Sequence, residues 1–279
     1  MNKIILTAHH KNDLAIPIFQ KYFTPIHVGA ALKEFDMGIT RDDLGENISI
    51  KNKNYCELTA YYYAYKNLNF DYAGLMHYRR IFSVKINRLS DVKSHLLYFS
   101  KRLRDIISIR DINLFLDNSF KTNSLVDLDE ECDQLSKFIK KNNFDVILPK
   151  KISYAYLDMG NQYAVNHCAH QFHIFNEIIT TKHPKFSNVI GKINRQKLIY
   201  PYNMFIMKRE LFMNYHDILF DILLEMEKYV DASVLNSYQG RVFGFLSERF
   251  LNYYIEMLRS ESRITIKELR TSFVTDAIS

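Results

Sequence analysis

The sequence contains few of the residues that interrupt a packed core. Its 279 residues include only 8 glycines and 5 prolines, whereas 47% are hydrophobic and 14% are aromatic. This composition excludes a disordered chain, because enough apolar surface can be buried to offset the entropy lost on ordering. The length predicts one large domain or two small ones.

Cysteine is scarce, and long apolar runs are missing. The 3 cysteines, Cys56, Cys132 and Cys168, show no C-x-x-C spacing. This argues against a disulfide scaffold or a zinc cluster and favours a reducing compartment. The first ten residues lack the apolar region and cleavage site of a signal peptide, and no apolar run is long enough to span a bilayer. We therefore expect a cytoplasmic protein.

Several common catalytic motifs are also absent. The sequence contains no G-x-G-x-x-G, P-loop, G-x-S-x-G or H-E-x-x-H motif, which weakens the case for a dehydrogenase, NTPase, hydrolase or zinc peptidase. The net charge of +6 indicates an anionic partner, such as nucleic acid, a membrane surface or a phosphorylated substrate. Nucleic acid is disfavoured, because the basic residues cluster in one segment and are not interleaved with aromatics across a face.

The remaining pattern is an alternation of strands and helices. We expect buried strands at residues 4–7, 26–29, 71–76, 144–148 and 202–207, helices at 52–67, 209–229 and 242–258, and a short closing strand at 263–266. This order predicts an α/β fold with a mainly parallel sheet flanked by helices.

One segment departs from this alternation. Residues 85–141 carry basic residues among leucines and isoleucines, followed by an acidic run at 127–133. We interpret this segment as a helical insertion in a single domain that spans 1–279. The core of that domain is then 1–84 with 142–208, followed by the helices and tail of 209–279.

The densest polar cluster is His77-Tyr78-Arg79-Arg80, directly after the expected strand at 71–76. Open α/β sheets bind ligands at the carboxyl ends of their strands. Two guanidinium groups and an imidazole can neutralise a diphosphate, and arginine binds its oxygens as a fork. The alternative is that an arginine pairs with Glu57 or Asp71 and that His77 is simply packed.

A polar loop before the helix at 52–67 contains Asp43, Asn47 and Ser49. Together with Asn52 at the helix start and His10 after the first strand, these residues are candidates for binding the nucleotide or sugar of a donor, because backbone N–H groups at such a turn hold polar ligands. The alternative is ordinary capping, in which side-chain oxygens satisfy the first amides of the helix.

Glu248 is the candidate general base. It is the carboxylate of the stretch 240–249, which enters the helix at 242–258, and a carboxylate beside an anionic site can accept a proton from a hydroxyl. The alternative is a salt bridge to Arg241 or Arg249. Asp158 and Asp231 are further candidates for the base.

Tyr163, His167 and His170 lie on another expected helix. His167 and His170 share one face, so a metal is conceivable, but no convergent Asp, Glu or Cys completes a ligand set. We favour solvated or hydrogen-bonded histidines, with His167 as a possible substrate contact, and predict no metal site.

These motifs together resemble a family of bacterial capsule and exopolysaccharide glycosyltransferases long labelled as a domain of unknown function, some of which transfer galactofuranose from its UDP donor. The resemblance rests on four stretches: Asp43-Leu-Gly-Glu-Asn-Ile-Ser-Ile-Lys-Asn-Lys-Asn-Tyr-Cys-Glu-Leu-Thr59, Gly74-Leu-Met-His-Tyr-Arg-Arg-Ile-Phe82, Asn203-Met-Phe-Ile-Met-Lys208 and Gly240-Arg-Val-Phe-Gly-Phe-Leu-Ser-Glu-Arg249.

The resemblance implies a GT-A-like fold and a cytoplasmic enzyme that uses a UDP-sugar to build a lipid-linked oligosaccharide. In common GT-A enzymes a metal-binding Asp-x-Asp follows the strand that corresponds to residues 71–76 here. This chain instead has His77, Arg79 and Arg80 at that place. We therefore expect no metal cofactor, because cationic side chains can stabilise the leaving diphosphate. On the acceptor side we place Tyr163, His167, Asn203 and Arg241.

The leading hypothesis is thus an inverting glycosyltransferase. The alternative is a non-catalytic binding protein for an anionic glycan or lipid, and a nucleic-acid-binding module is a weaker one. The basic stretch at 93–110 suggests peripheral contact with the anionic inner face of the cytoplasmic membrane, although an ordinary packed helix would show the same pattern.

Overall fold

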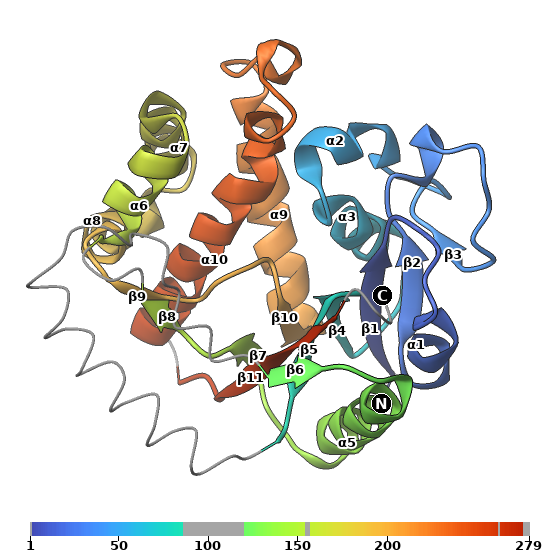
Figure 1. Ribbon diagram of the computed structural model, residues 1–279. Helices are drawn as coiled ribbons and strands as arrows, with labels where there is room; N and C mark the ends of the chain where they lie inside the picture. Colours follow the sequence, from blue (N-terminus) through green and yellow to red (C-terminus); the bar gives the residue numbers. More distant parts are fainter. Residues whose placement is uncertain (1, 86–119, 154–156, 262, 276–279) are drawn as a thin grey trace, which may run out of the picture.

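A computed structural model describes residues 2–85, 120–153, 157–261 and 263–275 (Figure 1). Its centre is a mixed sheet in the order β10-β7-β11-β5-β4-β1-β2-β3, with β6 beside β11. The strands of this sheet are β1 (Lys3–His9), β2 (Thr24–His27), β3 (Thr40–Arg41), β4 (Tyr72–His77), β5 (Arg80–Ser83), β6 (Phe120–Thr122), β7 (Val146–Pro149), β10 (Phe205–Lys208) and β11 (Ile266–Val274). Strands β8 (Ile152–Ser153) and β9 (Leu198–Ile199) form a separate pair.

Helices cover both faces of the sheet. They are α1 (Ile16–Tyr22), α2 (Asn52–Tyr55), α3 (Leu58–Asn67), α5 (Leu125–Lys141), α6 (Met159–Asn166), α7 (Ala169–Lys182), α8 (Ser187–Asn194), α9 (Arg209–Met226) and α10 (Val242–Glu261). In Figure 1, α1 and α5 lie below the sheet, and the remaining helices lie above or beside it.

The strands separate two hydrophobic cores because successive side chains point to opposite faces. In β10, Phe205 and Met207 join the larger core, formed with α3, α9 and α10, whereas Ile206 joins the smaller core. The smaller core is sealed by side chains of α1 and α5, among them Phe19 and Leu135. The strands are apolar on both faces because each face packs against a core, which explains why they are continuous apolar runs in the sequence.

Part of the sheet closes on itself. Strand β4 pairs with β5, β5 with β11, β11 with β7, β7 with β10, and β10 again with β4. Gly74 of β4 allows the last pairing, since a Cβ atom there would lie 2.2 Å from the carbonyl oxygen of Phe205 and 2.7 Å from the Cα of Ile206. A side chain at position 74 would therefore collide with backbone.

The α/β class is confirmed, and the described sheet is mainly parallel as expected: seven of its nine strands run in one direction, and β5 and β10 are reversed. Parallel pairing relates β1 to β2 and β4, whereas β10 and β5 both run antiparallel to β4. The closing strand is also longer and later than expected, since β11 covers Ile266–Val274 and not 263–266. Sequence periodicity reports which residues are buried, and it carries no information on strand direction.

The helix expected at 52–67 is broken in the structure. Cys56, between α2 and α3, has a φ of 53°, a left-handed conformation unusual for a residue with a side chain. Its carbonyl oxygen accepts hydrogen bonds from Asn52 Nδ2 at 2.8 Å and from Thr59 Oγ1 at 3.2 Å. These side-chain donors replace helical amides and hold the kink.

The described part of the expected insertion is not wholly helical. Residues 120–122 form β6, which pairs with β11, and the acidic run belongs to α5, whose first turn is capped by Ser124 Oγ accepting from the Asp127 amide at 3.1 Å. The basic stretch at 93–110 lies outside the described residues. Among the described residues, no helix combines the length and apolarity needed to cross a membrane.

The ring of strands predicts the effect of one substitution. Gly74→Ala should lower the free energy of unfolding by about 1–3 kcal/mol or more, because β4 and β10 must separate to admit the methyl group. Urea denaturation followed by circular dichroism measures this change.

Gly191→Ala provides the matched control. In α8 the nearest atom to an added Cβ is Arg195 Nη2 at 3.8 Å, so this variant should be unchanged or slightly more stable. Equal stability of the two variants would contradict the close approach at Gly74.

Candidate functional site

A cavity of about 1150 Å³ opens at the carboxyl ends of β1 and β4. His10 and His77 line one side, after these two strands. The other side is formed by the α2–α3 kink and by the start of α10. A cavity at the ends of parallel strands is where α/β folds bind ligands. We call it the cleft.

The arginine pair enters the cleft on a tight hairpin. His77 of β4 pairs with Arg80 of β5, so Tyr78 and Arg79 form the turn between the strands. The Tyr78 amide donates to the Ala8 carbonyl at 3.2 Å, and the Arg79 carbonyl accepts from the Val274 amide at 3.0 Å. The turn is therefore fixed by neighbouring strands on both sides.

Aromatic rings support both guanidinium groups. The Arg80 guanidinium carbon lies 3.8 Å from the centre of the Tyr202 ring, and the Arg79 carbon lies 5.4 Å from that of Phe273. Stacking of this kind holds the plane of a guanidinium group and leaves its N–H edge available. The Nε of Arg80 is buried with no hydrogen-bond partner among the described residues. The platform can thus bind the oxygens of a diphosphate.

His77 contributes a donor and not a charge. Its Nδ1 accepts from the Arg79 amide at 3.3 Å, which leaves the proton on Nε2. Burial, together with the nearby charge of Arg80, lowers the pKa of His77 to about 3. Burial lowers the pKa of His10 as well. The positive charge at this end of the cleft therefore comes from the arginines.

Carboxylates lie on the opposite wall. Glu57 follows the kink at Cys56, and its Oε1 accepts from Asn203 Nδ2 at 2.8 Å. The side-chain oxygen of Asn203, Oδ1, in turn accepts from Ser247 Oγ at 2.7 Å. This chain of hydrogen bonds ties the kink, the segment before β10 and helix α10 together beneath the cleft.

Glu248, nearly two turns into α10, exposes 25% of its side chain. Burial raises the pKa of its carboxyl group, and the adjacent Arg249 opposes this effect with a contact of 3.2 Å to Oε2. Glu57 raises the same pKa further, whereas Arg241 lowers it. A carboxylate with a raised pKa in a cleft has the properties of a general base.

Arg241, which precedes α10, contacts both the kink between α2 and α3 and the first turns of α10. Its Nε lies 3.3 Å from the sulfur of Cys56, and its guanidinium carbon lies 5.2 Å from the centre of the Phe245 ring. Burial raises the pKa of the Cys56 thiol to about 12, so this cysteine stays protonated. Arg241 adds a further positive charge to the cleft.

Eight of the residues singled out in the sequence line the cleft. They are His10, Asn52, His77, Arg79, Arg80, Asn203, Arg241 and Glu248. Residues from the two ends of the chain are thus brought into one cavity. Their individual roles in donor binding, acceptor binding and catalysis stay predictions.

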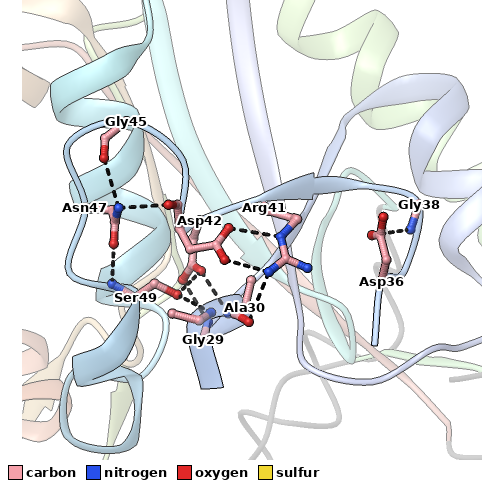
Figure 2. A network of polar contacts seen from close by, with 11 residues as sticks. Gly29, Ala30, Asp36, Gly38, Arg41, Asp42, Gly45, Asn47 and Ser49 are labelled. Atoms are coloured by element: carbon pink, nitrogen blue, oxygen red, sulfur yellow. Dashed lines mark hydrogen bonds and ion pairs between the residues drawn. The ribbon is translucent and has the colours of Figure 1, made fainter. Parts of the chain in front are cut away.

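Asp43, Asn47 and Ser49 do not line the cleft. Figure 2 shows their loop: Asn47 Nδ2 donates to the Asp43 and Gly45 carbonyls, both at 2.9 Å, and Ser49 Oγ donates to Asp42. Asp43 pairs with Arg41 at 2.6 Å. These groups hold the loop that leads into α2, but neither Ser49 nor Asn52 caps a helix start, because the described helices here have no side-chain cap hydrogen bond. Direct contact with a donor stays a prediction.

The same loop positions Asn52. The buried Asp42 carboxylate accepts from the amides of Gly29 at 2.8 Å and Ala30 at 3.0 Å (Figure 2). Gly29 has a φ of +69°, and a Cβ there would lie 2.7 Å from the Asn52 side chain. The turn therefore leaves space for Asn52 at the edge of the cleft.

Tyr163 and His167 also lie outside the cleft lining. Tyr163 is fully buried, with its ring 4.7 Å from that of Phe172. His167 stacks on Phe245 at 4.1 Å and shares a hydrogen bond of 3.2 Å with Gln239. Their present contacts are packing contacts, and the acceptor-side role expected for them stays a prediction.

Sequence reasoning missed three residues of the site. Glu57 was considered only as a partner for an arginine, and Tyr202 and Phe273, which support the guanidinium groups, were not identified. A φ of 65° at Tyr202 leaves no sequence signature. Phe273 lies beyond the expected end of the closing strand.

Within the described ranges, no group of three or more His, Cys, Asp or Glu side chains is arranged to hold a metal ion.

Comparison with known proteins places the chain in a family. It belongs to the family described as a domain of unknown function, DUF4422, whose model matches residues 3–260. Among solved structures, the chain is similar to the apo structure of the bifunctional glycosyltransferase WbbM, with 27% sequence identity and a TM-score of 0.79. The match covers 99% of this chain and 46% of that one, so this chain spans about half of that protein's length. No curated protein matches the sequence.

The arginine platform predicts anion affinity. Arg80→Ala should weaken the binding of inorganic pyrophosphate by about ten- to a hundredfold, because a charge-assisted fork and its stacking on Tyr202 are both lost. Isothermal titration calorimetry at low and high salt measures the affinity. The pyrophosphate affinity of Arg80→Lys should lie between those of the wild type and Arg80→Ala, since lysine keeps the charge without the fork.

Arg195→Ala is the matched control, because Arg195 Nε donates to the Gly191 carbonyl at the end of α8 and the residue does not line the cleft. Equal affinities of the Arg80→Ala and Arg195→Ala variants would show that Arg80 supports packing and not anion binding.

Proposed function

We propose that this protein is a GT-A-like glycosyltransferase that binds a nucleoside-diphosphate sugar in the cleft. The observation that carries the proposal is that one cavity contains a diphosphate-binding platform, Arg79 and Arg80, and a half-buried carboxylate, Glu248. Similarity over 99% of the chain to a structure of a glycosyltransferase supports it. Sugar transfer from such a donor uses both groups. The diphosphate leaves as an anion, which the arginines can stabilise, and the acceptor hydroxyl that attacks the anomeric carbon must lose its proton, which the carboxylate can accept.

In the proposed reaction an acceptor hydroxyl attacks the anomeric carbon, and the bond from that carbon to the diphosphate oxygen breaks. The acceptor proton passes to Glu248, and the negative charge of the departing diphosphate is stabilised by Arg79 and Arg80, with a hydrogen bond from His77. Attack opposite the leaving group inverts the anomeric configuration. Arg249 and Arg241 keep a positive charge beside Glu248 in its ionised form.

For the donor we propose a UDP-sugar, and for the acceptor a lipid-linked oligosaccharide of a capsule, O-antigen or exopolysaccharide. Support comes from the resemblance of four stretches of the sequence to glycosyltransferases of this type, some of which use UDP-galactofuranose. The net charge of +6 agrees with an anionic donor.

A donor screen tests the proposal directly. UDP-galactofuranose, UDP-galactose, UDP-glucose and UDP-N-acetylglucosamine are incubated with the protein, and release of UDP is followed. We expect slow hydrolysis of one of them, because water can replace the acceptor. Binding of UDP without hydrolysis or transfer of any donor would instead favour a non-catalytic binding protein.

We predict that turnover does not require a divalent metal. The arginine platform supplies positive charge where metal-dependent enzymes place a cation, so UDP release should persist in excess EDTA. Loss of activity in EDTA that is restored by manganese or magnesium would refute metal independence.

We predict that Glu248→Gln binds UDP normally and loses at least about a hundredfold in transfer rate, because the amide cannot accept the acceptor proton. Since burial raises the pKa of Glu248, the wild-type rate should fall as the pH drops through a value above that of an ordinary glutamate. The residual activity of the variant should lack this acidic limb.

Glu256→Gln is the matched control on the same helix, because the Glu256 side chain is comparably buried, with 15% exposed, and pairs with Lys192 outside the cleft lining. Melting temperatures of both variants separate catalysis from folding. A near wild-type rate for a folded Glu248→Gln protein would place the base elsewhere.

A further inference from the structure

A second cavity, of about 550 Å³, lies beside the cleft. Asn54, Ala232 and Ser233 line both spaces, so the two are neighbours separated by these side chains. Its volume falls within the range of about 300–1,000 Å³ typical of small-molecule sites. None of the residues identified from the sequence as site candidates lines it, apart from Asp231, an alternative for the base.

The cavity combines an aromatic floor with carboxylate walls. Tyr55 and Phe243 stack at 4.6 Å on the floor, and Tyr229 at the rim exposes 58% of its surface. The Glu227 carboxylate accepts from Tyr55 Oη at 2.8 Å and from Lys51 Nζ at 2.7 Å. Asp231 Oδ1 accepts from the Ser233 amide at 2.9 Å. Polar groups in this cavity are thus held in place by the protein.

The charges of this cavity balance, unlike those of the cleft. Lys51 pairs with Glu227 at 2.7 Å, and Lys228 pairs with Glu225 at 2.8 Å. No lysine here is left to neutralise an anionic ligand, whereas Arg79, Arg80 and Arg241 all face the cleft. The cavity therefore suits an uncharged ligand that both donates and accepts hydrogen bonds.

We infer that this cavity binds a neutral sugar unit of the acceptor glycan, next to the unit that receives the transferred sugar in the cleft. A sugar ring presents hydroxyl groups, which are donors and acceptors, to carboxylates and an apolar C–H face to an aromatic ring. Glu227 and Asp231 supply the acceptors, and Tyr229 supplies the exposed ring. This inference rests on the proposed glycosyl transfer and adds where the acceptor binds.

The test uses simple sugars as probes. Methyl glycosides of galactose, in pyranose and furanose forms, of glucose, of mannose and of N-acetylglucosamine are mixed with the protein and UDP, and saturation-transfer NMR detects binding. At least one glycoside should bind the wild type. Tyr229→Ala and Glu227→Gln should each weaken that binding by about tenfold, while the affinity for UDP stays unchanged.

Two variants control for indirect effects. Glu210→Gln changes an exposed carboxylate in the first turn of α9 that does not line the cavity, and Tyr238→Ala removes an exposed tyrosine of the same loop. Both should bind the glycoside as the wild type does.

Three results would overturn the inference: no glycoside binding to a wild-type protein that binds UDP, glycoside binding unaffected by Tyr229→Ala and Glu227→Gln, or equal losses in the control variants. Absence of UDP binding by the wild type would instead count against the proposed function, so the two failures are distinguishable.

Discussion

The close backbone approach of β4 and β10 at Gly74 is the constraint on which the site depends. It gives β4 hydrogen-bonded neighbours on both edges, β1 on one side and β10 on the other. With its direction fixed, β4 delivers the hairpin of His77 to Arg80 into the cleft, and β5 returns along β11. The ring that follows places Phe273 beneath both guanidinium groups. Packing at a single glycine thus determines where two charges lie.

The cleft separates positive from negative groups by their elements. The sheet supplies Arg79 and Arg80, whereas the helical layer supplies Glu57 and Glu248, and Asn203 connects the two layers through its bonds to Glu57 and Ser247. The arginine platform and the carboxylates are thus held on different secondary-structure elements, while Glu248 pairs with Arg249 of its own helix. Arg80 stays stacked on Tyr202, with its Nε unpaired within the described part of the chain. Unpaired hydrogen-bonding capacity of this kind is what a ligand can use.

Much of this arrangement could be predicted from the sequence, for identifiable reasons. The strand at 71–76 and the helix from residue 242 were evident because buried runs and helical periodicity are local signals. Eight of the residues with candidate roles line the cleft, since chemically unusual clusters such as His77 to Arg80 follow buried strands. The reversed direction of β10 could not be predicted, because an antiparallel strand has the same apolar pattern as a parallel one.

Other features depend on contacts distant in sequence. The left-handed conformation of Cys56 relies on Asn52 and Thr59, and the support of Arg80 by Tyr202 joins positions over a hundred residues apart. The loop with Asp43, Asn47 and Ser49 shows a further limit. Its polar residues look alike whether they bind a ligand or satisfy backbone amides, and the structure places them in hydrogen bonds with their own loop. Composition alone could not separate the two.

The position of β11 has a consequence for synthesis of the chain. Phe273 follows Arg80 by 193 residues (273 minus 80), a stretch that the ribosome needs roughly 10–40 s to add. Throughout that time the outer edge of β5, which pairs with β11 in the finished fold, has no partner strand among those described. Charged residues on an exposed edge discourage pairing with other chains. Arg79 and Arg80 stand at the start of that edge, so the charges that face the cleft in the finished fold are also of the kind that disfavours pairing of an open edge with other chains.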